Sequence, residues 1–314
     1  MLFSNYQKTV IGGKEMFVNQ ANLRGLNVTF STAYNKAFDG VKTNYEKIAT
    51  TVPSTTAETD YKWLGQLPQM KEWVGEREIQ KMAAYGYSIK NKKFEMTVSV
   101  PRDDIEDDQY GVYTPLFSNM GEAAAEHPDT LVFETMKKGF TEKCYDGKPF
   151  FATDHPSGEG GKTPTSNMSH LKLSTDSYEA ARTAIMSVTG DKGKSLNLVP
   201  DLLVVAPANE KMARLILKAD QIEGTTNVYK DTAELLVATE LADKPDAWFL
   251  LCTNKFLKPF IFQKRKPVEL TALTRNNDEN VFMRDEFVWG ADGRSNAGYG
   301  FWQMAYGSDG TARG

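Results

Sequence analysis

Apolar side chains near the start of the chain recur with the spacing of a helix. Four of them stand four residues apart: Leu26, Phe30, Tyr34 and Phe38. This spacing predicts an amphipathic helix whose apolar stripe is too narrow to form a core of its own. We therefore expect residues 1–56 to be an arm that docks on something larger, ending in a linker at residues 53–56, where Pro, Ser and Thr follow one another.

Alternating apolar positions further along the chain indicate two β-strands. The first run covers residues 85–89 and the second covers residues 94–100, with Lys-Asn-Lys-Lys between them. The pattern predicts a hairpin with a charged tip. Because a two-stranded ribbon is only marginally stable in water, its apolar face needs a neighbour in the same subunit or in the next one. The stretch before it, with Trp63 and Trp73 among glycines and prolines, is typical of an extended loop.

A long helical pattern follows an acidic run. The acids at 103–108 precede apolar rows with helical spacing over residues 114–140, and carboxylates are favoured where a helix begins. Proline inside a helix removes a hydrogen bond and clashes with the preceding turn. We therefore predict either one long helix kinked near His127 and Pro128 or two abutting helices.

The second half of the chain predicts an α/β unit over residues 176–264. Asp176 and Glu179 have the spacing of a capping box and begin a helix that runs through Val188. The remaining elements are a buried strand at 202–206, a helix at 209–218 with Met212, Leu215 and Ile216 inside, and strands at 247–251 and 260–262. Residues 268–306 alternate again and predict a β-meander, so the α/β unit would be an insertion in a second, α+β domain.

Composition and charge narrow the class of protein. The chain has 314 residues, with 37 Lys and Arg against 41 Asp and Glu, for a net charge of −4. This length suffices for about two domains, and the acidic balance argues against tight binding to nucleic acid. No stretch approaches the ~20 apolar residues of a membrane span. Cys144 and Cys252 stand far apart without partners at metal-ligand spacing, so we expect no disulfide framework, no zinc site and a cytoplasmic, reducing setting.

Two segments invite a catalytic interpretation. Asp154 and His155, near Cys144 and Asp146, form the single cluster that could hold a nucleophile, a base or a metal, which leaves a hydrolase that uses Cys144 and His155 as an alternative of another class. The residues at 146–149 and 154–156 also have the composition of ordinary turns, which explains them without a catalytic role. Residues 190–195 end like a phosphate-binding loop, but Val188 replaces its first glycine and the segment follows a helix instead of a strand. We therefore predict no enzyme, no cofactor and no metal.

The acidic run also has a structural interpretation. It lacks the spacing of a calcium loop, so it is either the solvated start of a helix or a surface that pairs with basic patches. Such patches occur at residues 90–93 and at residues 264–266. Pairing between subunits would set register and association more than affinity.

Short sequence motifs distributed along the chain resemble those of one protein family. The motifs are Trp63-Leu64-Gly65, the stretch from Glu72 to Arg77, Tyr87-Ser88-Ile89, Arg102-Asp103-Asp104 with Glu106-Asp107-Asp108, the stretch from Cys144 to Gly147, Asp154-His155-Pro156, the stretch from Lys258 to Gln263, Val281-Phe282-Met283 and the stretch from Ala297 to Met304. Together they resemble the Mu-like bacteriophage major head protein, the T subunit family.

The resemblance implies an HK97-like capsid fold of the α+β class. Its parts would be an N-terminal arm at 1–56, an E-loop with flanking strands at 57–100, a P domain at 101–175 with a spine helix at 114–140, an A domain at 176–264 and returning P-domain strands at 265–314. Related shells include some that crosslink a lysine to an asparagine, for which Lys90 and Asn91 are available.

The function that the resemblance implies is mechanical. Hexamers and pentamers would build an icosahedral shell around double-stranded DNA without binding it specifically, with scaffold/protease and portal proteins as partners. The protein would be made in the host cytoplasm and reside in the virion, away from membranes. An encapsulin-type compartment shell is the alternative within the same fold. The predicted intersubunit contacts are Trp63, Trp73, Lys90, Lys92, Lys93, Asp103, Asp104, Asp107 and Asp108.

Overall fold

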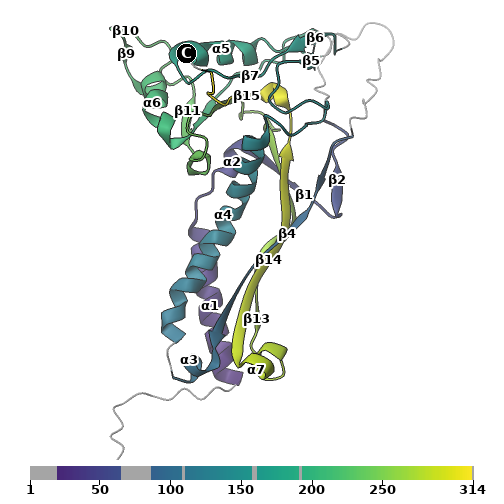
Figure 1. Ribbon diagram of the computed structural model, residues 1–314, viewed down its shortest axis with the longest axis vertical. Helices are drawn as coiled ribbons and strands as arrows, with labels where there is room; N and C mark the ends of the chain where they lie inside the picture. Colours follow the sequence, from purple (N-terminus) through teal and green to yellow (C-terminus); the bar gives the residue numbers. More distant parts are fainter. Residues whose placement is uncertain (1–19, 65–85, 108–109, 158–160, 191–192, 313–314) are drawn as a thin grey trace, which may run out of the picture. The chain divides into compact units, whose positions relative to one another are not determined.

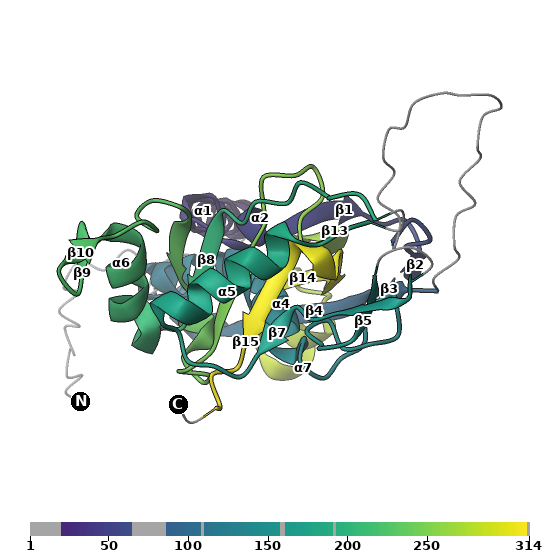
Figure 2. The same cartoon turned by 90° about the horizontal axis from the view of Figure 1, so that it is seen from above.

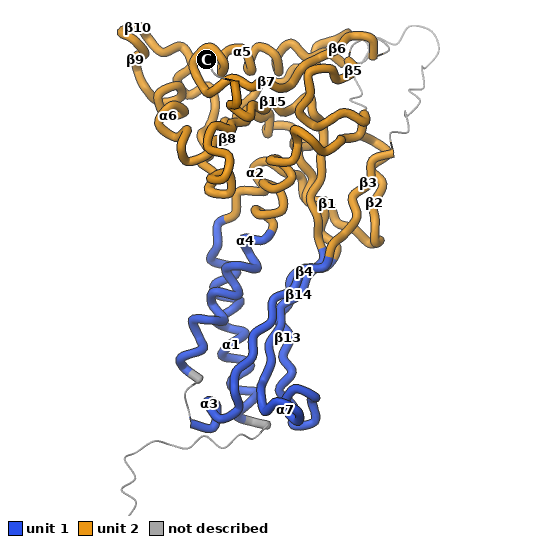
Figure 3. Tube along the Cα trace, in the orientation of Figure 1, with its two compact units in different colours: residues 1–42, 93–127, 266–294 blue, residues 43–92, 128–265, 295–314 orange. Residues whose placement is uncertain are grey.

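The chain folds into two compact units (Figure 3). A computed structural model describes residues 20–64, 86–107, 110–157, 161–190 and 193–312. Unit 1 combines residues 1–42, 93–127 and 266–294, and unit 2 combines residues 43–92, 128–265 and 295–314. Each unit is therefore assembled from segments that are distant in the sequence. Among the described helices, none is both long and apolar enough to cross a membrane.

Helices and long strands form unit 1 (Figure 1). Its elements, of which α4, β4, β13 and β14 extend into unit 2, are α1 (Gln20–Gly40), β4 (Lys92–Pro101), α3 (Arg102–Glu106), the 3₁₀ helix η1 (Tyr110–Tyr113), α4 (Thr114–Lys138), β13 (Phe260–Leu273), α7 (Glu279–Arg284) and β14 (Glu286–Tyr299). The four-stranded sheet has the order β1-β13-β14-β4, in which β1 (Ala49–Pro53) runs parallel to β13.

The predicted amphipathic helix is present as α1. Phe30 is fully buried and stacks on Phe117 of α4 with a ring separation of 4.0 Å, and both rings meet Trp289 of β14 edge to face. The helix therefore supplies part of the core of unit 1 within its own subunit. The expected linker at 53–56 is wrong in its first residue, because Pro53 closes strand β1.

Helices α1 and α4 approach closely at Gly121. A Cβ atom built on Gly121 would lie 2.2 Å from the backbone oxygen of Tyr34. Glycine is required at this position because no side chain fits between the two backbones. Pro128 stands inside α4, which is one continuous helix, so the alternative of two abutting helices is wrong.

The predicted hairpin at 85–100 is also wrong. Strand β3 (Ser88–Lys90) pairs with β2 (Glu58–Asp60), whereas β4 pairs with β14 in another sheet. Asn91, at the expected tip, is instead buried and hydrogen-bonded. Each strand finds a partner far away in the sequence, a choice that local alternation does not reveal.

A five-stranded sheet organises unit 2. Its order is β11-β8-β12-β15-β7, and Figure 2 shows α5 crossing one face of it. The elements are α2 (Tyr45–Ile48), β5 (His155–Ser157), β6 (Thr163–Thr165), β7 (Met168–Ser169), α5 (Thr175–Met186), β8 (Leu202–Val205), α6 (Glu210–Lys218), β9 (Gln221–Ile222), β10 (Thr225–Thr226), β11 (Glu234–Val237), β12 (Trp248–Leu251) and β15 (Ala305–Ser308), together with the 3₁₀ turns Pro207–Asn209, Thr239–Leu241 and Trp302–Met304.

The α/β pattern predicted for this region is present, with local corrections. Helix α5 is capped by Ser174, whose side chain accepts from the backbone of Ser177, instead of by Asp176. Met212 and Leu215 are exposed on α6, and Ile216 is buried. The last predicted meander is wrong as well, since residues 279–284 form a helix and β15 joins the sheet of unit 2.

Candidate functional site

Trp63, a predicted contact between subunits, packs within its own chain. Its ring lies edge-on to Tyr61, with centroids 5.8 Å apart, and 6.0 Å from Phe301. The side chain is only half-buried, so one side stays accessible to a neighbour. Trp73, the second predicted contact, lies outside the described residues.

A buried polar network holds the strands next to Trp63. The amide of Gln263, fully buried, accepts from the hydroxyl of Tyr61 at 2.8 Å and donates to the side-chain oxygen of Asn91 at 2.9 Å. The amide nitrogen of Asn91 donates to Ser54 and to the backbone oxygen of Thr56. Every hydrogen-bonding atom of the Asn91 amide is thus occupied, which disfavours its reaction with a lysine.

The predicted charged contacts lie on the surface in two groups. Lys90, Lys92 and Lys93 are exposed. Asp103 and Asp107 are exposed as well, whereas Asp104 is half-buried and accepts a hydrogen bond from the hydroxyl of Tyr113. Asp108 lies outside the described residues.

Cys144, Asp146 and His155 are brought together, as their proximity in the sequence suggested. Their ligand-type atoms lie within 4.8 Å of one another. His155 is fully buried, and its Nδ1 lies 2.6 Å from Oδ2 of Asp146. The other ring nitrogen lies 3.2 Å from the backbone oxygen of Phe150, and the ring stacks on Trp302 at 4.1 Å and 6°.

The geometry and pKa values of this cluster indicate a structural role. Burial, followed by the charge of Asp146, raises the pKa of the Cys144 thiol well above its usual value, so the thiolate nucleophile is disfavoured. Both nitrogens of His155 face acceptors, so neither is placed to take the thiol proton. Burial works against ionisation of Asp146 and is the largest single influence, but the hydrogen bond and charge of His155, together with hydrogen bonds from Lys148 and Cys144, outweigh it and lower the pKa of Asp146. The geometry therefore ties a turn to Trp302 and does not support the hydrolase alternative.

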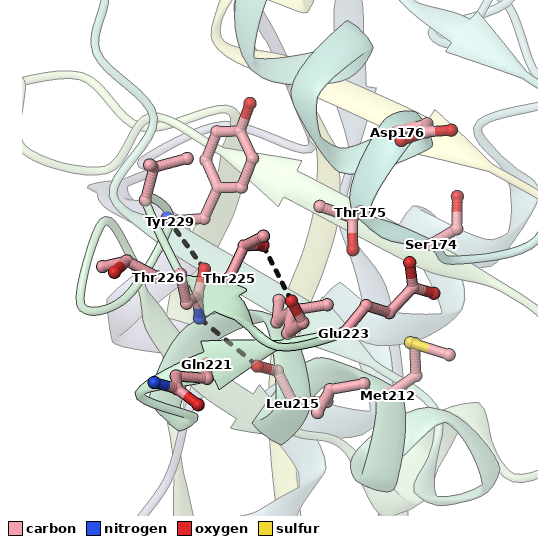
Figure 4. A pocket seen from close by; sticks show the side chains of 13 residues that line it. Ser174, Thr175, Asp176, Met212, Leu215, Gln221, Glu223, Thr225, Thr226 and Tyr229 are labelled. Atoms are coloured by element: carbon pink, nitrogen blue, oxygen red, sulfur yellow. Dashed lines mark hydrogen bonds between the residues drawn. The ribbon is translucent and has the colours of Figure 1, made fainter.

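A groove on unit 2 was missed by the sequence analysis. Met212 and Leu215 of α6 face Ser174 and Thr175 at the start of α5, with the β9–β10 hairpin on the third side (Figure 4). Asn227 fixes the hairpin by donating to the backbone oxygen of Ile216 at 2.8 Å. The lining mixes hydroxyls and apolar groups with the carboxylates of Asp176 and Glu223. It contains no His or Cys, so no imidazole or thiol is available there for nucleophilic catalysis.

Comparisons with known proteins identify the family of the chain. The profile of the Mu-like prophage major head subunit gpT family matches residues 23–172, 168–241 and 238–312. The major capsid protein of Escherichia phage Mu is 36% identical over 295 residues, which cover 92% of this chain and 74% of that protein. The Mu-like prophage FluMu major head subunit of Haemophilus influenzae is 36% identical over 285 residues, covering 90% and 72%.

The fold leads to the same family. The procapsid of bacteriophage JBD30 contains a chain that is 35% identical to this one, with a TM-score of 0.60 over 93% of this chain and 76% of that chain. The fold is therefore the HK97-like capsid fold of the α+β class. The chain belongs to the Mu-like prophage major head subunit family and is a major capsid protein, a structural component of the phage virion and not an enzyme.

Proposed function

We propose that the subunits assemble as hexamers and pentamers into an icosahedral shell that encloses double-stranded DNA. The observation that carries this proposal is the combined similarity of sequence and fold to the JBD30 procapsid chain, which extends over 93% of this chain. The family profile matches residues in both compact units, so the similarity extends over the whole chain and is not limited to one domain.

The roles of the segments follow the predicted domain map. Residues 57–100 serve as the E-loop with its flanking strands, α4 as the spine helix of the P domain, and residues 176–264 as the A domain, with 1–56 as the arm and 265–314 as returning strands. Three strands of the sheet of unit 2, β8, β11 and β12, lie within residues 176–264 and support the A-domain assignment of that range, whereas β7 and β15 join the sheet from outside it. The nine predicted contacts, from Trp63 to Asp108, then lie between subunits.

The DNA is enclosed without being held. The net charge of −4 supports this, because a basic wall would bind phosphates and retard packaging. Scaffold/protease and portal proteins are the proposed partners, supplying the template for assembly and the vertex through which DNA enters. The encapsulin alternative is not favoured, since the curated relatives at 36% identity are phage head proteins.

Cryo-electron microscopy of shells formed by the full chain tests the proposal. We expect closed particles with fivefold vertices and sixfold capsomers, and a single monomer band after the particles are boiled in detergent. Helical tubes or flat sheets as the end products would contradict the icosahedral shell, and a ladder of covalent multimers would contradict a shell without crosslinks between subunits.

A further inference from the structure

One end of unit 1 gathers three short or terminal elements: α3, α7 and the first turns of α1 (Figure 1). Hydrogen bonds hold them in place. The backbone nitrogen of Arg102 donates to the backbone oxygen of Asp285 at 3.0 Å, which links α3 to the end of α7. Asn27 of α1 donates to Thr274 at 3.1 Å and accepts from Trp289 at 3.0 Å. This end is therefore a fixed surface on which charges keep their positions.

A basic hollow opens in this surface. It is lined by Leu23, Arg24, Asn27, Ala272, Thr274, Arg275 and Asn276. The guanidinium groups of Arg24 and Arg275 are exposed, and within the described ranges neither lies within 4.0 Å of a carboxylate. The Asp278 carboxylate near Arg275 accepts from its backbone nitrogen at 2.8 Å and not from its guanidinium. The hollow thus presents two guanidinium groups without an ion pair among the described residues, beside fixed amide and hydroxyl groups, an arrangement that favours carboxylates.

Complementary charges lie on α3 and just after it. Asp104 and Glu106 are used internally, by Tyr113 and Arg102 respectively. Asp103 and Asp107, in contrast, are exposed and form no ion pair with another described residue. The same end therefore displays two carboxylates that pair with no basic group among the described residues of unit 1.

Apolar side chains on α7 accompany these charges. Phe282 is 82% exposed and Met283 is 69% exposed. Large apolar side chains gathered beside charged groups are typical of a surface that a partner covers. The charges identify that partner, because the complement of each charged group is present on the same chain.

We propose that this end of unit 1 is a contact between two copies of the chain, in which Asp103 and Asp107 of one copy face the hollow formed by Arg24 and Arg275 of another. The inference rests on the proposed shell, since it assigns one of its contacts. Because a copy carries both halves, the contact can repeat from subunit to subunit and close into a ring, or pair two copies reciprocally. The basic partner of the acidic residues is then this hollow and not Lys90, Lys92 and Lys93.

Charge reversal in the full chain tests the contact. The acid variant carries Asp103→Lys and Asp107→Lys, and the base variant carries Arg24→Glu and Arg275→Glu. Light scattering gives the lowest subunit concentration at which shells form. We expect each variant to need a concentration higher by about tenfold or more, since like charges then face each other. The chain with all four changes should return to the wild-type concentration, which also shows that neither pair prevents folding.

A control separates the contact from net charge. Lys211→Glu and Lys244→Glu, both exposed residues of unit 2, restore the net charge of the acid variant without touching the hollow, and assembly should stay impaired. If this control restores assembly as well as the fourfold exchange does, net charge is the cause and the proposal is wrong.

Two further results would overturn the inference while leaving the shell intact. One is unchanged assembly in both reversal variants, with an unchanged dependence on NaCl. The other is a base variant that assembles normally but retains less nucleic acid per shell, which would make the hollow a phosphate site. Failure of the wild-type chain to form shells would instead contradict the proposed function.

Discussion

The close approach of α1 and α4 at Gly121 leads to a prediction in which overpacking and helix propensity change the stability in opposite directions. Replacing Gly121 by Ala places a methyl carbon 2.2 Å from the backbone oxygen of Tyr34 and 3.1 Å from the backbone nitrogen of Phe38. Ordinary contacts begin near 3.4 Å, so the two helix backbones would have to separate by about an ångström. Backbone atoms cannot rotate away as the tip of a side chain can.

The magnitude follows from the two opposing contributions. Overpacking a tight site costs about 1–3 kcal/mol, and a backbone neighbour places this site in the upper part of that range. Alanine in a helix interior gains about 1 kcal/mol over glycine. We therefore expect Gly121→Ala to lower the free energy of unfolding by about 1–2 kcal/mol.

Gly25 is the matched control. It is also a helical glycine of unit 1, but no atom lies within 4 Å of the position that its Cβ would take. Gly25→Ala should therefore raise the free energy of unfolding by about 0.5–1 kcal/mol, because only the helix propensity changes. Urea unfolding of the unassembled subunit, followed by tryptophan fluorescence and circular dichroism, measures both. If Gly121→Ala is as stabilising as Gly25→Ala, the close approach of α1 and α4 is refuted.

Three other variants test the buried pair and two surface contacts. Asp146→Asn should lower the free energy of unfolding by about 3 kcal/mol at neutral pH, because it leaves buried His155 without its charged partner. The pKa of Asp146 is lowered from 3.8 in the folded chain. The stabilisation by its carboxylate is therefore complete above pH 3.8 and is lost as the pH falls through the lowered pKa, so the difference in free energy of unfolding between wild type and variant should shrink in acid. A difference that stays constant would contradict the pair. Trp63→Ala should impair shell formation, measured by light scattering, more than it lowers the stability of the unassembled subunit against urea. An equal loss of shell formation and of stability would contradict a role for Trp63 between subunits. Phe282→Ser with Met283→Ser should change stability by less than about 0.5 kcal/mol because both side chains are exposed, yet should weaken assembly, and unimpaired assembly would mean that α7 stays in solvent.

The local sequence pattern was sufficient to predict burial where the residues of a single helix or strand determine which side chains face the core. The stripe on α1 and the apolar run of β8 predict burial because period and hydrophobicity require it, and Phe30 and Leu203 are both fully buried. The cluster around His155 was also found, because its members lie on adjacent turns. Its partner Trp302 was not, since it comes from the far end of the chain.

Pairing across long distances in the sequence could not be predicted. The alternation at 85–100 is real, but β4 pairs with β14, nearly two hundred residues away, instead of with β3. Leu215 has helical spacing for the inner face of α6, yet it lines an open groove because Ala213, Ile216 and Leu217 fill the core. The hollow beside Arg275 depends on a contact between Asn27 and Thr274, which nothing in either local segment indicates.

Self-assembly is the property that distinguishes a shell subunit from any other α+β protein. Electron microscopy of the purified chain at high concentration, together with its sedimentation, tests it most directly. The account predicts rings or closed shells that sediment far ahead of the 35.1 kDa subunit. Monodisperse monomers at every concentration, without rings, tubes or shells, would contradict it.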